Sequence, residues 1–140
     1  MLVDEIKKAN VQAMKDKDMV ARSIYSVILN KIMLEGIKKR EKGEEIVDAD
    51  VSNILQKTIK ELEEEKENYT KVGNNEEVEK ILAQIEIAKK YLPKMLSKDE
   101  IREIINGLED KSVPAVMKHF KTNFNGKCDM REVGEVLKSL

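Results

Sequence analysis

One stretch constrains the fold of this 140-residue chain more than any other, the run from Asn74 to Glu100. Its apolar residues recur every three or four positions, which is the spacing of one helix face: Val78, Ile81, Leu82, Ile85, Ala88 and Leu92. Asn75 is the expected N-cap. Pro93 is expected to end the helix, because proline has no N–H to donate. Ser97 to Glu100 then has the pattern of a capping box, so a second group of helices is predicted after a stiff elbow.

Three helices are expected before this one. The first covers Val3 to about Asp16. The second, Met19 to about Arg40, is apolar on more than one side, which is typical of a helix packed between others. The third is capped by Asp48 and buries Val51, Ile54, Leu55, Thr58, Ile59 and Leu62. Its apolar stripe thins toward Gly73, so we expect it to project beyond the core and turn back as an antiparallel hairpin with the fourth.

Three short helices are expected after the elbow, opened by the capping residues Ser97, Ser112 and Asp129. Asn125-Gly126 can supply the positive φ of a tight turn before the last of them. The last helix is expected to bury Val133, Val136, Leu137 and Leu140. The chain is therefore predicted to be all-α: an N-terminal multihelical bundle with a long helical hairpin in residues 1–93, and a small three-helix C-terminal domain in residues 94–140.

Composition restricts the function classes. The net charge is −1, so an RNA-binding surface would have to be a local patch. No apolar run approaches the roughly 18 residues of a membrane span, so no membrane association is expected. A single cysteine excludes an internal disulfide and suits a reducing compartment. The N-terminus, Met1-Leu-Val-Asp-Glu5, has no basic region followed by an apolar core, so no secretory signal is expected. The cytoplasm or an organelle matrix is the expected location.

Three separated motifs resemble those of YqeY-like proteins. They are Tyr91-Leu-Pro-Lys-Met-Leu-Ser97 with the preceding Lys71-Val-Gly73, Glu79 and Glu86; Glu35-Gly-Ile37; and Gly126-Lys-Cys-Asp129. These proteins are free-standing relatives of the tail domain of the B subunit of tRNA-dependent amidotransferases (GatB). The resemblance implies two helical domains, and a tail that engages tRNA while catalysis occurs elsewhere.

The chain departs from that pattern in places. An acidic run from Glu61 to Glu65 stands where relatives tend to be basic, Pro114 stands where they often have Gly, and Met130 replaces a Gly. The acidic run argues against RNA contact through the third helix.

Two residues could carry chemistry, His119 and Cys128. A partly exposed structural histidine is favoured over a general base, since no Ser or Cys partner is evident. A small turn residue is favoured over a thiol activated by a helix N-terminus. One His and one Cys do not make a zinc site, and no phosphate-binding glycine motif is present. No metal, no cofactor and no catalysis by the chain alone are expected.

Two basic clusters remain, and either is more often a solvated face than an RNA site. One is Lys38, Lys39, Arg40 and Lys42; the other is Lys111, Lys118, His119, Lys121 and Lys127. For tRNA or aminoacyl-tRNA we expect Lys118, Lys121 and Lys127 to supply the contacts, with the N-terminus of the last helix receiving a phosphate. Phe120 and Phe124 are expected to pack in the core.

Three functions stay open from the sequence. The first is a non-catalytic tRNA-binding module, accessory to tRNA-dependent amidation. The second is a protein–protein adaptor acting through the hairpin tip from Tyr69 to Asn75. The third, less favoured, is a carbon–nitrogen ligase component that uses glutamine as amide donor.

Overall fold

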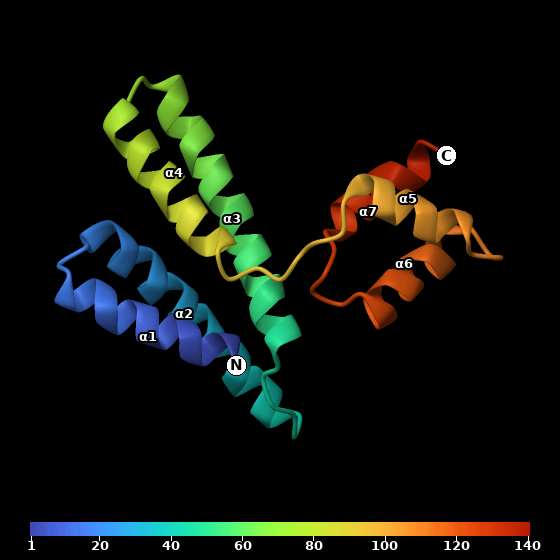
Figure 1. The fold of residues 1–140 in the computed structure, drawn as a ribbon, viewed down its shortest axis with the longest axis horizontal. Helices are drawn as coiled ribbons and strands as arrows, with labels where there is room; N and C mark the ends of the chain where they lie inside the picture. Colours follow the sequence, from blue (N-terminus) through green and yellow to red (C-terminus); the bar gives the residue numbers. More distant parts are fainter. The chain divides into compact units, whose positions relative to one another are not determined.

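The computed structural model describes residues 1–140, and it is helical, with seven helices and no strand (Figure 1). The helices are α1 (Leu2–Lys15), α2 (Met19–Glu41), α3 (Asp48–Lys71), α4 (Asn75–Lys89), α5 (Lys98–Asn106), α6 (Val113–Asn123) and α7 (Met130–Lys138). The all-α prediction is confirmed. The chain divides into two compact units, Met1–Leu92 and Pro93–Leu140, and each has its own hydrophobic core.

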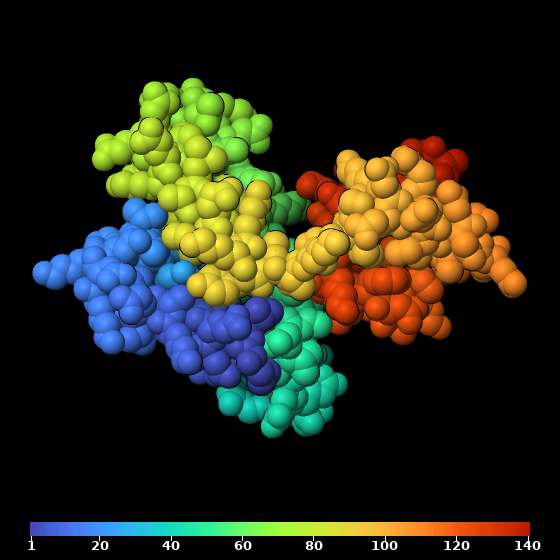
Figure 2. Space-filling view, in the orientation of Figure 1, coloured from blue at the N-terminus to red at the C-terminus, as the bar shows by residue number.

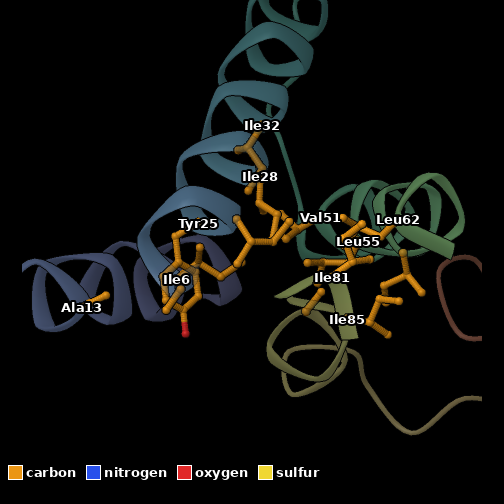
Figure 3. Packing of buried hydrophobic residues seen from close by; sticks show 14 residues of the cluster. Ile6, Ala13, Tyr25, Ile28, Ile32, Val51, Leu55, Leu62, Ile81 and Ile85 are labelled. Atoms are coloured by element: carbon orange, nitrogen blue, oxygen red, sulfur yellow. The ribbon is translucent and has the colours of Figure 1, made fainter. Parts of the chain in front are cut away.

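The first unit consists of two helical hairpins, α1–α2 and α3–α4 (Figure 1). Lys17 closes the first with φ +56°, and Gly73 closes the second with φ +72°. Helix α2 packs against the other three helices. The core between them is aliphatic apart from Tyr25, as Figure 3 shows. Its completely buried members are Ile6, Ile28, Val51, Leu55 and Ala88.

Helix α2 is central, but it is not enclosed on all sides as its composition suggested. One stripe is buried, formed by Ala21, Ile24, Tyr25, Ile28 and Ile32. Several other apolar side chains face solvent: Val27 is 44% exposed, Met33 54%, Leu34 51% and Ile37 42%. A four-helix unit covers only part of a central helix, so the remaining apolar surface stays open.

Two predicted caps are displaced by one residue. Asn74, not Asn75, caps α4, because its carboxamide oxygen accepts from the Glu77 N–H at 3.3 Å. Val47, not Asp48, is the N-cap residue of α3. Asp48 lies inside the helix instead, and its carboxylate accepts from the Leu2 N–H at 3.1 Å. Asp18, of a residue type favoured at helix N-caps, caps α2 and accepts a bond from the Ala21 N–H at 3.1 Å.

Helix α4 ends before the proline. Its last residue is Lys89, and the N–H groups of Tyr91 and Leu92 then bond three residues back, to the carbonyls of Ala88 and Lys89. Pro93 therefore follows a tightened turn and does not itself break the helix. Leu82 is 44% exposed and does not belong to the buried stripe.

The α3–α4 hairpin extends beyond the core, as expected from the thinning stripe. Leu62 is the last buried residue of α3. Tyr69 is half-buried against the core cluster, and Val72 near the turn is 76% exposed.

The second unit packs α7 against both α5 and α6. Its completely buried residues are Ile101, Ile105, Val116, Phe120 and Val133. The capping box at Ser97 is formed: the Glu100 N–H bonds to the Ser97 hydroxyl, and the Ser97 N–H bonds to the Glu100 carboxylate, each at 3.2 Å. Leu140, expected in this core, is 54% exposed, because α7 ends at Lys138.

Candidate nucleic-acid interface

Helix α6 carries two of the predicted RNA-contacting lysines on its outer face. Val116 and Phe120 point into the second core and are completely buried. Lys118 and Lys121, three residues apart, are exposed and so share the solvent side of the helix. In Figure 2 this orange-red segment lies at the surface of its unit.

Lys127 lies in the loop between α6 and α7, and its backbone is held on both sides. Its N–H donates to the Phe124 carbonyl at 2.9 Å, across a turn in which Gly126 has φ +76°. Its carbonyl accepts from the Leu96 N–H at 2.8 Å. The loop is thus fixed to the beginning of the unit while the Lys127 side chain remains exposed. The Leu96 contact could not be predicted from the sequence, because it joins residues distant in the chain.

The three lysines are among those that have no electrostatic partner in the structure, whereas some other lysines are paired. Lys31 pairs with Glu61, Lys80 with Glu77 and Lys98 with Glu135. None of Lys118, Lys121 and Lys127 takes part in an ion pair in the structure. Their ammonium groups are therefore available to an external anion without breaking an internal contact.

The N-terminus of α7 is not the free anion site that its position suggested. The Asp129 carboxylate accepts from the Arg131 N–H at 2.9 Å. It thereby occupies one free donor and places negative charge where a phosphate would have to bind. The capping carboxylate therefore disfavours a phosphate at this helix end, and the phosphate contact stays a prediction.

The aromatic rings of this region form a packed group. The ring centroids of His119 and Phe120 are 5.8 Å apart, and those of Phe120 and Phe124 are 5.6 Å apart. Phe120 is completely buried and Phe124 packs against the same core, so core packing is confirmed over base stacking. His119 Nδ1 lies 3.2 Å from the Asn123 side-chain nitrogen, a structural contact on its own helix.

Cys128 has the features of a structural turn residue. It is 4% exposed, and its thiol donates to the Phe124 carbonyl at 3.6 Å. Burial raises the pKa of the thiol, and the charges of Asp129 and Glu132 raise it further. The interpretation as an activated thiol is therefore wrong. No group of three or more His, Cys, Asp or Glu residues is placed to hold a metal ion.

The basic run at the end of α2 is broken by an internal ion pair. Lys39 Nζ lies 3.3 Å from an Asp50 carboxylate oxygen and 3.4 Å from one of Glu44. These carboxylates raise the pKa of Lys39, Asp50 most strongly. Only Lys38, Arg40 and Lys42 remain exposed there, so this cluster is a weaker anion site than its sequence suggested.

The fold defines an all-helical protein of two units, the smaller of which presents unpaired lysines on an exposed helix and its following loop. Residues 3–140 match the family described as Yqey-like protein, and the chain belongs to that family. A search of curated proteins gives no match to the chain. None of its helices has the length and apolarity needed to cross a membrane.

Proposed function

We propose that this protein is a tRNA-binding module that is accessory to tRNA-dependent amidation and has no catalytic activity alone. The observation that carries the proposal is the set of three exposed, unpaired lysines, Lys118, Lys121 and Lys127, on the second unit. Two of them share one helix face, and the backbone of the third is held by hydrogen bonds. The proposal also rests on the resemblance of YqeY-like proteins to the tail domain of the amidotransferase B subunit.

The first unit supports the same division of roles. Glu61, Glu63, Glu64 and Glu65 are exposed along α3, and a row of carboxylates repels a phosphate backbone. Phosphate contacts by lysine are mainly electrostatic and position the RNA without reading its sequence. The proposed surface therefore recognises the backbone of a folded RNA.

The test is a charge reversal with a matched control. The parent should bind unfractionated tRNA with an affinity that falls with salt, at a log–log slope of about −2 to −3 for three phosphate contacts. Replacing Lys118, Lys121 and Lys127 by Glu should abolish binding. Replacing Lys8, Lys15 and Lys60 by Glu makes the same change of charge on exposed residues of the first unit, and it should leave most of the binding.

Two results would overturn the proposal. One is equal binding by the parent and the Lys118, Lys121, Lys127 variant, with the helical signal of both intact. The other is an equal loss in the two triple variants, which would show that only net charge matters.

The accessory role has a separate test. The protein alone should release no ammonia from glutamine, because the only histidine and the only cysteine are engaged in structural contacts. Glutamine hydrolysis by the purified chain would favour the ligase interpretation. A protein-adaptor function is the second candidate, and the observation that favours it is a groove on the first unit.

A further inference from the structure

The first unit contains a groove that RNA binding does not use. It lies between α2 and the α3–α4 hairpin and has a volume of about 590 Å³. Its apolar lining comes from Ile24, Val27, Leu62, Tyr69 and Ile81. Val27 is 44% exposed, whereas Ile24, Leu62 and Ile81 are buried. The groove thus offers a partner an apolar floor with one accessible side chain of α2 at its edge.

The charged residues of the groove all have one sign. Glu61, Glu65 and Glu77 line it, and no Lys, Arg or His does. Lys31 holds Glu61 at 2.6 Å. Glu77 is paired with Lys80, but a solvent-exposed pair of this kind is worth little. Glu65 takes part in no ion pair. The groove is therefore complementary to a positively charged ligand.

Hydrogen bonds fix α2 to the α3–α4 hairpin on either side of the groove. The Gln84 side chain donates to the Val20 carbonyl at 3.4 Å. Eleven positions further along α2, Lys31 donates to Glu61 at 2.6 Å and to the Thr58 hydroxyl at 3.2 Å. Eleven helical residues span about 16 Å, which is the length of three helical turns of a ligand. The elements that line the groove are thus joined to each other in the free protein, which limits the rearrangement that binding requires.

We propose that this groove binds a basic amphipathic helix of a partner protein. Apolar residues of the partner, three and four positions apart, would lie on Val27, Tyr69 and Ile81. Flanking Lys or Arg residues would face Glu65 and Glu77. RNA does not fit, because the carboxylates repel phosphate.

Two other hollows of this unit do not specify a partner. The one near Met33 and Ile46 is lined by Lys7, Arg40 and Glu45. The one near Leu34 is lined by three lysines and three acidic residues: Lys31, Lys38, Lys57, Glu35, Asp50 and Glu61. Because residues of both charges line each hollow, neither hollow favours a ligand of one sign of charge.

The experiment uses a labelled helical peptide of Leu and Lys, with Leu on one face, and the same peptide with Glu in place of Lys. Binding to the full chain is measured by fluorescence anisotropy. The Lys peptide should bind and the Glu peptide should not. The double variant Glu65→Lys, Glu77→Lys should weaken binding at least about tenfold, a loss that corresponds to 1.4 kcal/mol. The variant Val27→Gln, which removes the apolar edge, should weaken it similarly.

Matched controls separate the groove from general attraction. Glu63→Lys with Glu64→Lys makes the same charge change on α3, at exposed residues outside the groove. Met33→Gln, like Val27→Gln, replaces an exposed apolar side chain of α2 by glutamine, but Met33 lies outside the groove. Both should bind the Lys peptide within about twofold of the parent, since distant surface sites are near neutral.

Three outcomes would overturn the inference. An equal loss in the two double variants would indicate diffuse charge attraction, and unchanged binding in the groove variants would place the peptide elsewhere. A parent that dimerises at micromolar concentration, with monomeric groove variants, would assign the groove to a second copy of this chain. The tRNA binding of each variant is measured as well. If all variants still bind tRNA, these outcomes concern the groove alone and leave the RNA proposal standing.

Discussion

The hydroxyl oxygens of Tyr25 and Tyr91 lie 3.1 Å apart, and their rings meet edge to face with centroids 6.0 Å apart. The pair joins the N-terminal half of α2 to the turn after α4, two residues before Pro93. Burial raises the pKa of Tyr25 above its ordinary value near 10, and the hydrogen bond between Tyr25 and Tyr91 raises it further. The neutral phenol is therefore favoured in the folded protein.

The pair predicts a loss of stability at alkaline pH. Below pH 10 Tyr25 is protonated in both states and contributes no pH dependence. Above pH 10 the unfolded chain loses this proton while the folded chain retains it, so the free energy of unfolding falls with rising pH. Tyr25→Phe should cost about 1 kcal/mol at pH 7, the typical value of one hydrogen bond, and its deficit should shrink above pH 10. Denaturation from pH 7 to 11 measures this, with Tyr69→Phe as control. A constant deficit would contradict it.

The difference in burial along α2 predicts that an isoleucine-to-alanine substitution lowers the free energy of unfolding by different amounts at two sites. Ile28 is completely buried, so Ile28→Ala should cost about 2–5 kcal/mol. Ile37 is 42% exposed, so Ile37→Ala should cost under about 0.5 kcal/mol. Chemical denaturation measures both, and equal losses would mean that α2 is oriented differently. Lys39 would not serve as an exposed control site on α2, because its ammonium group forms ion pairs with Asp50 and Glu44.

Cys128 predicts slow thiol labelling. Its side chain is 4% exposed and its pKa is raised by burial, so a thiol reagent should modify the native protein far more slowly than the unfolded one. Val133→Ala, a cavity in the same core, should accelerate labelling. Val11→Ala, at an exposed site of the first unit, should leave the rate unchanged. Fast labelling of the native parent would contradict the buried position.

The two separate cores predict that a truncated chain still folds. Residues 1–92 hold a complete core cluster, so this fragment should unfold cooperatively and keep its helical content. Residues 93–140 should also be helical but less stable, because a smaller unit buries a smaller share of its surface. Circular dichroism of both fragments, compared with the parent, tests this. A long fragment that lacks a cooperative transition would show that the units depend on each other.

The helices and most of the core could be predicted from the sequence, because periodicity and capping residues act locally. Ser97 and Asp18 were recognisable caps for this reason. The errors concern contacts between distant residues. Asp48 looked like a cap, yet its carboxylate bonds to the Leu2 N–H, and Leu82 follows the stripe although no helix covers it.

The candidate sites show the same limit. Lys118 and Lys121 could be placed on one helix face from spacing alone. The pairing of Lys39 with Asp50 depends on how α2 packs against α3. The acidic groove was missed because Val27 and Glu77 are far apart in sequence. The only local indication of this groove in the sequence is the pair Glu61 and Glu65, four residues apart. The acidic run that contains them was used only as an argument against RNA contact.

The two ends of the connection between the units have a consequence for binding. Leu92 packs against the first core and Leu96 against the second. Four residues reach at most about 14 Å when fully extended. The units are therefore joined by a short tether, and a partner complex whose two binding elements both reach their sites would engage the second with an effective concentration on the order of millimolar. A partner complex that offers both a basic helix and an RNA would be held by avidity, even if each contact alone were weak.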